Sequence, residues 1–262
     1  MSTVRFERTG DVGSIVLANA PGNELSREFA DDLLASVHDA SVSSIRALMI
    51  RAEGPNFGTG GQVPEWVDKD GNWFRTFIAE VNRAYAAIEA LRIPTIGVVR
   101  GAVVSGHYEL VLRVDLIIAS ENATFTWVES RTGFTPLAGG LQRLAERIGR
   151  GRAAAHVMLA KSLLAAEAEQ IGLVFRVVPD AELDSAANQL AEDMARGATR
   201  GHSATRALLK AWSSGGVAGA DELMLDLSMD LYASLDVQNA IAEIARAAKN
   251  GEDYVPPSFV GK

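Results

Sequence analysis

Residues 101–115 read GAVVSGHYELVLRVD, and this stretch carries a charged side chain, Glu109, among apolar neighbours. A valine-rich run ends at Ser105 and Gly106, and residues with helical spacing follow. Carboxylates are rarely buried unless they are paired or take part in chemistry. A glutamate one turn into an otherwise apolar element therefore needs an explanation, and the rest of the chain supplies the candidates.

Length and composition are those of an ordinary globular protein. The 262 residues are enough for one large domain, or for one domain with a smaller appendage. Hydrophobic residues make up 48% and charged residues 22%, which is not the composition of a disordered chain. The formal net charge of −8 argues against nucleic acid or an anionic membrane as a partner. We therefore expect no nucleic-acid partner and no membrane partner.

Cysteine and histidine usage limits the possible chemistry. The sequence has no cysteine, which excludes disulfides, thiolate nucleophiles and cysteine-based metal sites. Its four histidines show no metal-ligand spacing, so we expect no metal site. The N-terminal stretch lacks the features of a signal peptide, and no apolar run approaches the length of a membrane span. We expect a cytoplasmic location.

Strand patterns alternate with helix patterns in the first half of the chain, and helix patterns dominate the second half. Strands are predicted at residues 4–7, 14–17, 46–51, 94–99, 115–120 and 173–178, with helices at 26–40 and 72–92. Further helices are predicted at 139–149, 152–160, 166–171, 183–197, 201–213 and 219–249. The pattern indicates an α/β core at residues 1–197 and a helical C-terminal region at residues 198–262.

The loop FGTGGQ, residues 57–62, is rich in glycine but matches no nucleotide-binding motif. A phosphate loop would continue with Gly-Lys-Ser/Thr, and a dinucleotide fingerprint requires G-x-G-x-x-G. The loop is either a flexible surface turn or a place where the backbone closely approaches a ligand, because glycine has no Cβ in the way.

Gly106 is expected at the start of a helix that follows a strand. The first backbone N–H groups of a helix are unpaired and carry the positive end of its dipole. Such groups can polarise a carbonyl as half of an oxyanion hole. Taken alone, the glycine favours a structural interpretation, because glycine before a helix is common.

A second glutamate, Glu129, follows Glu109 by twenty residues. If residues 124–129 are extended, Phe125, Trp127 and Glu129 share one face of the strand. Desolvation beside two aromatic rings would raise the pKa of this carboxyl toward general-acid use. The alternative is that both glutamates lie on solvated surfaces. For His107 no triad partner is evident, so packing or hydrogen bonding is favoured over catalysis.

The order of these segments resembles the crotonase (enoyl-CoA hydratase/isomerase) superfamily. The segments that carry the resemblance are PGNEL (21–25), FGTGGQ (57–62), IPTIGVVRGAVVSGHYELVLRVDLIIASENATF (93–125), ESRTGFTPLAGGLQRLAERIGRGRA (129–153) and LLAAEAEQIGLVFRVVP (163–179). The resemblance extends over nearly the whole chain. It implies a spiral of ββα units with a helical C-terminal region that forms trimers, which often pair into hexamers.

The resemblance also implies roles for individual residues. The N–H groups of Gly61 and Gly106 correspond to the family's oxyanion hole, which holds a thioester carbonyl and its enolate. Glu109 and Glu129 fall on the two glutamates that hold a catalytic water in hydratases. Such chemistry needs a base, an acid and an anion trap, but no metal or redox cofactor. Coenzyme A enters only as part of the substrate.

Departures from the family pattern concern the acyl pocket and the coenzyme A clamp. A three-glycine run is replaced by Ser105-Gly106-His107, an aspartate by Gln62, and the glycine after Pro136 by Leu137. The loop at residues 19–25 is shorter than usual and lacks its basic residue. We expect the substrate to contact Asn23, Leu25, Gln62, His107 and Leu137.

The sequence leaves four functions to consider. An enoyl-CoA hydratase is favoured, because both glutamates are present. An isomerase or another acyl-CoA lyase of the superfamily is the main alternative, since a fold does not fix a reaction. A hydrolase that cleaves β-diketones without coenzyme A would carry His and Asp where this chain has Glu129 and Ala138. A non-catalytic binding protein is disfavoured by the glutamate pair.

Overall fold

The chain begins with the antiparallel hairpin that its alternating residues predict, formed by β1 (Val4–Thr9) and β2 (Val12–Leu17). The computed structural model describes residues 2–262. Its other strands are β3 (Ala47–Ala52), β4 (Thr95–Val99), β5 (Ala102–Val104), β6 (Leu116–Ser120), β7 (Thr124–Thr126), β8 (Leu163–Leu164) and β9 (Arg176–Val178). Its α-helices are α1 (Arg27–Val42), α2 (Gly71–Ala90), α3 (Gly106–Val111), α4 (Glu129–Thr132), α5 (Gly140–Ile148), α6 (Arg150–Leu159), α7 (Ala165–Gln170), α8 (Leu183–Arg196), α9 (Thr199–Tyr232) and α10 (Leu235–Asn250). Two short 3₁₀ helices lie at Val63–Trp66 and Asp180–Glu182.

The strands form two sheets. The larger has the order β1-β2-β3-β4-β6-β9, and every pair after the first hairpin is parallel. The smaller has the order β5-β7-β8. Each parallel step requires a crossover, which is usually helical, and α1 and α2 supply two of them. The expected α/β fold with successive ββα units and a helical C-terminal region is confirmed.

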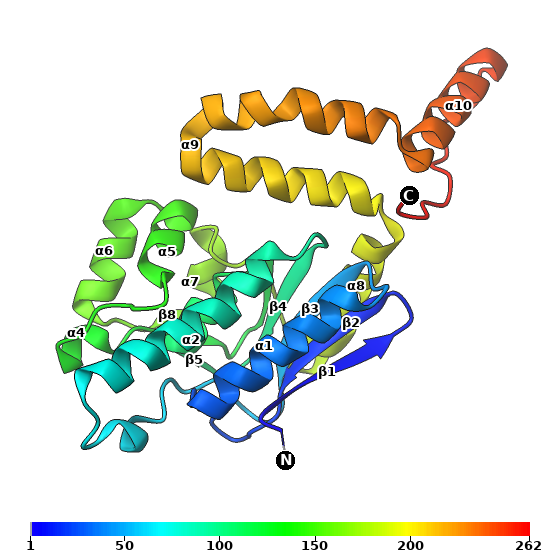
Figure 1. Cartoon of the computed structure of the whole chain (residues 1–262). Helices are drawn as coiled ribbons and strands as arrows, with labels where there is room; N and C mark the ends of the chain where they lie inside the picture. Colours follow the sequence, from blue (N-terminus) through cyan, green and yellow to red (C-terminus); the bar gives the residue numbers. More distant parts are fainter. Residues whose placement is uncertain (1) are drawn as a thin grey trace.

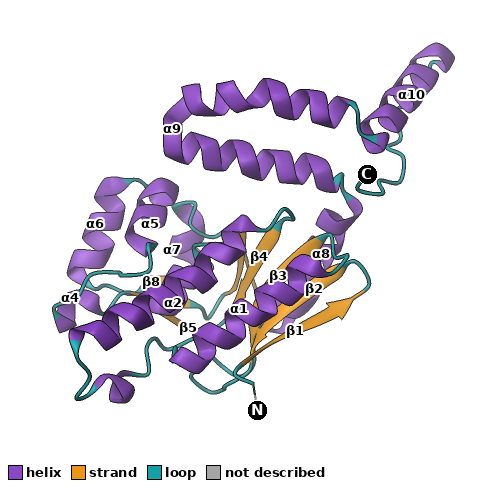
Figure 2. Ribbon diagram, viewed as in Figure 1, coloured by secondary structure: helices purple, strands orange, loops and turns teal. Residues whose placement is uncertain are grey.

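Helices cover both faces of the larger sheet, as Figures 1 and 2 show. On one face α1 and α2 bury their apolar stripes in the main core, with Phe29 and Leu33 from α1 and Phe77 and Ile88 from α2 fully or almost fully enclosed. On the other face α8 packs a smaller cluster against β3, β4 and β6. Parallel strands covered on both faces read as continuous apolar runs, which is why β4 is buried throughout.

Side-chain caps fix where the first two long helices begin. The Ser26 hydroxyl accepts a hydrogen bond from the N–H of Phe29 (3.1 Å) and so caps α1 at the start of the helix predicted for residues 26–40. The Asp70 carboxylate accepts one from the N–H of Trp73 (2.8 Å) and starts α2. Because α1 and α2 pack on each other, these caps also set the position of the site between α2 and α3.

The C-terminal helices lie beyond the sheet and its covering helices (Figure 1). The predicted interruption between residues 213 and 219 is confirmed: Gly216 has a non-helical backbone (φ 66°), and α9 folds back on itself there. The predicted continuous helix 219–249 is wrong, because α9 ends at Tyr232. The Ser234 hydroxyl then caps α10 by accepting a hydrogen bond from the N–H of Val237 (3.3 Å). The division of the chain near residue 197 stays a prediction.

The predicted extended segment 124–129 is also corrected. The strand β7 ends at Thr126, Val128 adopts a helical backbone conformation, and Glu129 is the first residue of α4. Phe125 and Trp127 are fully buried as expected, but Glu129 does not continue their strand face. Within residues 2–262 no helix combines the length and the apolar character needed to cross a membrane.

Candidate active site

A cavity of about 220 Å³ opens between α2, α3, α4 and the glycine-rich loop. Its apolar walls are made by Leu25, Val63, Trp66, Phe74, Phe77, Ile78, Val81, Val128, Phe134, Leu137 and Ala138. Its polar lining consists of Thr59, Ser105, Thr132 and Thr135, with backbone from Gly60, Gly61 and Gly106. Among the described residues, Glu109 and Glu129 are the charged side chains that line it. An apolar pocket with a few convergent polar groups is the usual form of a small-molecule site.

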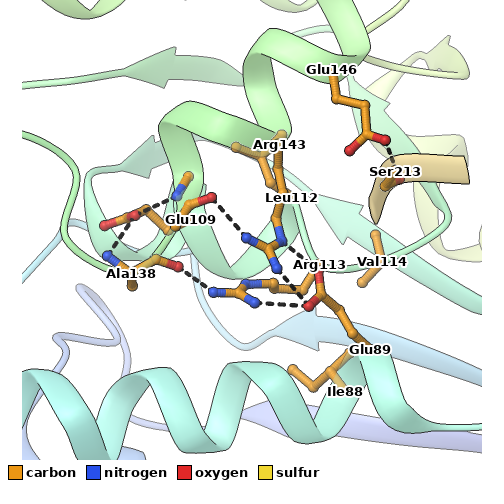
Figure 3. A network of polar contacts seen from close by, with 12 residues as sticks. Ile88, Glu89, Glu109, Leu112, Arg113, Val114, Ala138, Arg143, Glu146 and Ser213 are labelled. Atoms are coloured by element: carbon orange, nitrogen blue, oxygen red, sulfur yellow. Dashed lines mark hydrogen bonds and ion pairs between the residues drawn. The ribbon is translucent and has the colours of Figure 1, made fainter. Parts of the chain in front are cut away.

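Glu109 lies on the first turn of α3 and is 3% exposed. Its Oε2 accepts hydrogen bonds from the backbone N–H groups of Ala138 (2.8 Å) and Gly140 (2.7 Å), and its Oε1 accepts one from that of Leu137 (3.2 Å). Figure 3 shows the carboxylate held by this segment of backbone. The question raised by the sequence is thus answered structurally: the buried carboxylate is paired with main-chain donors.

The surroundings of Glu109 act on its pKa in opposite directions. Burial disfavours the charged form and is the largest effect, and it raises the pKa to about 7. The three N–H donors stabilise the charged form and oppose this rise, whereas the charge of Glu129 adds to it. The carboxyl therefore exchanges its proton near neutral pH, which is the range in which a general base works best.

Glu129 reaches the cavity from the first turn of α4 and is 8% exposed. Within residues 2–262 its Oε2 is buried and accepts no hydrogen bond. Burial raises the pKa of this carboxyl. Nearby backbone groups and the Ser105 hydroxyl oppose this rise, but the net shift favours the protonated form, in which the side chain can deliver a proton to the cavity.

Gly61 and Gly106 line the same cavity as the two carboxylates. Gly61 is in register with Leu25 in an isolated bridge, and Gly106 opens α3. No hydrogen bond from either N–H to another residue is found among residues 2–262. A Cβ at Gly61 would lie 2.4 Å from the Trp66 ring, and one at Gly106 would lie 2.6 Å from the Leu25 side chain, so a larger residue at either position would require that neighbour to shift.

The loop and the helix start are brought together by β5. Gly58 bridges Val103, with hydrogen bonds from the N–H of Gly58 to Ala102 (3.0 Å) and from the N–H of Val104 to Gly58 (2.9 Å). Ser105 follows with a positive φ of 51°, a conformation that favours glycine. This turn directs the first N–H groups of α3 toward the cavity.

The structure brings together six of the nine site residues predicted from the sequence. Both glutamates, both glycines, Leu25 and Leu137 line the cavity. Asn23 and Gln62 do not. The fully buried Asn23 amide holds its own loop together, accepting from the N–H of Asn19 (2.9 Å) and donating to the carbonyls of Glu53 (3.1 Å) and Asn56 (3.0 Å).

His107 does not line the cavity, and its predicted contact with substrate stays a prediction. Its ring is fully buried against the edges of Phe29 and Phe57, at centroid distances of 5.2 and 6.4 Å. Burial lowers its pKa to about 4, so the ring is neutral at physiological pH. Gln62 is half-buried and contributes its backbone, with its N–H donating to the Leu25 carbonyl (3.0 Å).

The aromatic wall of the cavity was not predicted. Trp66 meets Phe74 edge-on (centroids 5.5 Å apart), and Phe74 stacks on Phe134 (5.6 Å). Phe74 and Phe77 lie on α2, where the sequence predicted a helix at residues 72–92. The available signal in the sequence was the width of the apolar stripe on α2, because one side of this stripe faces the cavity.

Metal-binding geometry is absent from the described part of the chain. Within residues 2–262 no group of three or more His, Cys, Asp or Glu side chains could hold a metal ion. The expectation that the reaction uses no cofactor stays a prediction.

The fold and the paired carboxylates at an apolar cavity define an enzyme of the crotonase class, and sequence comparison identifies the family. Residues 7–243 match the model of the enoyl-CoA hydratase/isomerase family, and the chain belongs to that family. A 2,3-dehydroadipyl-CoA hydratase of Escherichia coli is 33% identical over 182 residues, which are 68% of each chain. A short-chain-enoyl-CoA hydratase of Clostridium acetobutylicum is 29% identical over 197 residues, which are 73% of this chain and 74% of the relative.

Solved structures agree with this assignment. An enoyl-CoA hydratase subunit I of Geobacillus kaustophilus superposes with a TM-score of 0.88 at 27% identity, covering 99% of this chain and 98% of its own. The enoyl-CoA hydratase of Bacillus anthracis has a TM-score of 0.89, covering 99% of this chain and 100% of its own; its 23% identity shows the fold alone.

Proposed function

We propose that the protein is an enoyl-CoA hydratase, which adds water across the double bond of an α,β-unsaturated acyl-CoA. The observation that carries the proposal is that Glu109 and Glu129 line one cavity with different hydrogen-bonding surroundings. Hydration needs one group to take a proton from water and another to deliver a proton to Cα. The two carboxyls can divide these roles.

The surroundings of the carboxyls favour one assignment of the roles. Glu109, whose charged form three N–H groups stabilise against burial, takes a proton from water as the oxygen bonds to Cβ. The double-bond electrons move toward the thioester oxygen, and the N–H groups of Gly61 and Gly106 hold the resulting enolate. Glu129 then gives its proton to Cα. The sum is addition of one water, and exchange with solvent resets the two carboxyls.

The proposal is tested by mixing the protein with crotonyl-CoA and with longer and aromatic enoyl-CoAs. Hydration removes the absorbance of the conjugated thioester. Turnover of at least one of these substrates supports the hydratase. If the protein hydrates none of these substrates, hydration is no longer the favoured function.

The main alternative is an isomerase that moves the double bond of a 3-enoyl-CoA into conjugation. One carboxyl suffices for such a shift, so a second buried glutamate favours hydration. The two reactions change the absorbance in opposite directions, since isomerisation creates the conjugated thioester. A 3-enoyl-CoA substrate therefore separates them in the same assay.

The assembly and the location of the protein belong to this proposal. Apolar side chains on α9 and α10 are exposed in the single chain, namely Met224, Leu225, Met229, Tyr232, Leu235, Ile241 and Ile244. Exposed apolar surface of this kind marks an interface, and we propose a homotrimer or a dimer of trimers. We propose a cytoplasmic location and an acyl-CoA as the only partner besides further copies of the chain.

A further inference from the structure

Arg113 lies directly behind the proposed catalytic carboxylate and is itself buried, with an exposed fraction of 6%. Its Nη1 donates to the carboxylate of Glu89 (2.8 Å), and its Nη2 donates to the carbonyl of Ala138. Its guanidinium also lies over the ring of Tyr85, 5.9 Å from the centroid. A buried arginine is costly unless it is paired, and this one is held by Glu89, the Ala138 carbonyl and the Tyr85 ring, although its Nε has no partner within residues 2–262.

The backbone around Ala138 is hydrogen-bonded to an arginine on one side and to Glu109 on the other. The Ala138 carbonyl accepts from Arg113, while its N–H donates to Glu109 (2.8 Å). Arg143 also holds this backbone, because its Nη1 donates to the carbonyl of Gly139 (3.0 Å) while its Nη2 donates to Glu89 (2.7 Å). Figure 3 shows the whole arrangement, with the backbone lying between the arginines and the carboxylate of Glu109.

The fit of this backbone segment leaves it little room to shift. A Cβ at Gly140 would lie 2.6 Å from the Glu109 Cγ, and one at Gly139 would lie 3.0 Å from the Arg113 Nη2. The segment is therefore in close contact with Glu109 on one side and with Arg113 on the other. Since three of its N–H groups hold the Glu109 carboxylate, a shift of the segment changes the position of that carboxylate.

Arg113 is also linked to the second half of the site. The hydroxyl of Tyr85, the ring that Arg113 covers, donates to the carbonyl of Gly106 (2.8 Å). Gly106 supplies one of the two N–H groups proposed to hold the enolate. Through Tyr85, Arg113 is therefore in indirect contact with the backbone that opens α3.

We propose that Arg113 is a positioning residue that holds residues 137–140 against Glu109 and so fixes the orientation of the catalytic base. The inference rests on the proposed function insofar as Glu109 is the base. A merely structural ion pair would stabilise the fold without affecting Glu109. The two roles therefore differ in what happens to Glu109 when the arginine is replaced.

The test replaces Arg113 and follows Glu109 itself. Arg113→Met removes the cation and both donors. Arg113→Lys keeps a cation for Glu89 but lacks the fork that reaches the Ala138 carbonyl at the same time. The control is Arg206→Met, because Arg206 is 12% exposed at its side chain, pairs with Asp115 and does not line the cavity. The titration of Glu109 is read from the infrared carboxyl band that Glu109→Gln abolishes.

We expect Arg113→Met to raise the pKa of Glu109 by about 1 pH unit, because residues 137–140 would no longer be held with their N–H donors placed against the carboxylate. We expect kcat at pH 7 to fall about 10- to 100-fold with KM nearly unchanged, as for a misplaced catalytic group. Arg113→Lys should lie between Arg113→Met and the wild type, and Arg206→Met should match the wild type.

Two results would overturn the inference: a folded Arg113→Met or Arg113→Lys variant with an unchanged Glu109 titration, or an equal change in Arg206→Met. If the Arg113→Met variant does not fold, the Glu109 titration in the Arg113→Lys variant decides whether the inference holds. The infrared titration needs no substrate. It therefore tests the position of Glu109 even if the wild type proves not to hydrate enoyl-CoA, an outcome that contradicts only the proposed function.

Discussion

Glu109 and Glu129 line the same cavity from the first turns of two different helices, yet their carboxylates are held differently. Glu109 accepts three backbone hydrogen bonds, whereas the Oε2 of Glu129 accepts none within residues 2–262. When the surroundings of two carboxyls differ, their pKa values differ, and a single proton is bound by one of them in preference to the other. This asymmetry underlies the first two predictions.

Replacing either glutamate by glutamine should abolish most activity and leave the fold intact. Each change keeps the side-chain volume but removes the proton transfer, so kcat should fall by about 10²- to 10⁴-fold. The measurement is hydration of crotonyl-CoA or of the best substrate found, with circular dichroism as the control for folding. Folded variants with near-native kcat would show that the two carboxyls are structural.

The rate should rise with pH through neutrality. In the proposed hydration, the active form has Glu109 charged and Glu129 protonated. Because the pKa of Glu109 is raised to about 7, kcat/KM should fall about tenfold for each pH unit below that value. Ionisation of Glu129 acts in the opposite direction, because it removes the proton that Cα receives, and burial raises the pKa of this carboxyl. A kcat/KM that stays constant between pH 5 and 7 would contradict the assignment of Glu109 as the base.

The order of elements could be predicted from the sequence, because period-two and helical patterns reflect burial directly. The hairpin, the Ser26 cap and the apolar stripes of α1 and α2 follow from local residues alone. The break at Ser234 was missed because leucines continue on both sides of it, although serine is a common N-cap and marked the start of α10. Local patterns thus predict elements well and their ends less well.

The site was predicted only in part, for a different reason. Residues two apart on a helix point in nearly opposite directions, so Glu109 in the cavity places His107 in the core. That relation was available from the sequence and favours packing for His107. The role of Arg113 was not available, because its partners Glu89 and Ala138 are brought to it only by the fold. Contacts between distant segments carry no local signal.

The acyl pocket should prefer a neutral acyl group. Its walls are apolar and aromatic, and within residues 2–262 no lysine, arginine or histidine lines it. A carboxylate buried there would lose its hydration and face two acidic side chains, a cost of several kcal/mol. The matched pair is hex-2-enoyl-CoA and 2,3-dehydroadipyl-CoA, which differ only at the end of a six-carbon chain.

We expect kcat/KM to favour hex-2-enoyl-CoA by about 100-fold or more, since 1.4 kcal/mol corresponds to a factor of ten. Phe74→Arg offers the complementary change, as it would place a cation in the wall and narrow the difference. Equal rates for the two substrates in the wild type would mean that the end of the chain reaches solvent.

The exposed apolar side chains of α9 and α10 should form an interface between copies of the chain. Met229 is 64% exposed in the single chain, so Met229→Glu costs little in a monomer but should disrupt an assembly. Light scattering should give a mass of three or six chains for the wild type and a smaller mass for the variant. Val42→Glu, at an apolar position on α1 that is 71% exposed, is the matched control and should keep the wild-type mass. A monomeric wild type at micromolar concentration would contradict the interface.

Coenzyme A chemistry and coenzyme-free cleavage of β-diketones make different demands on the same cavity. Both pass through an enolate, so both need the N–H groups of Gly61 and Gly106, and these donors cannot discriminate. A coenzyme A ester also brings phosphates, whose binding energy supports kcat as well as affinity. The surface hollow at the loop 19–25 is poor in cations, since Glu24 is its charged residue among the described ones that line it. This favours weak coenzyme A binding.

The catalytic positions nevertheless point to the thioester. Glu129 and Ala138 stand where the diketone-cleaving branch carries His and Asp, and the acid–base groups decide which proton moves, whereas a loop only adjusts binding. Coenzyme A should therefore bind measurably in calorimetry, with a dissociation constant that increases with salt because its phosphates contribute. A cyclic β-diketone should not be cleaved. The Glu109→Gln variant serves as the control, since it should bind coenzyme A as the wild type does while losing turnover. Diketone cleavage without coenzyme A binding would reverse the order of the two functions, because it would show that these two carboxyls serve carbon–carbon hydrolysis instead.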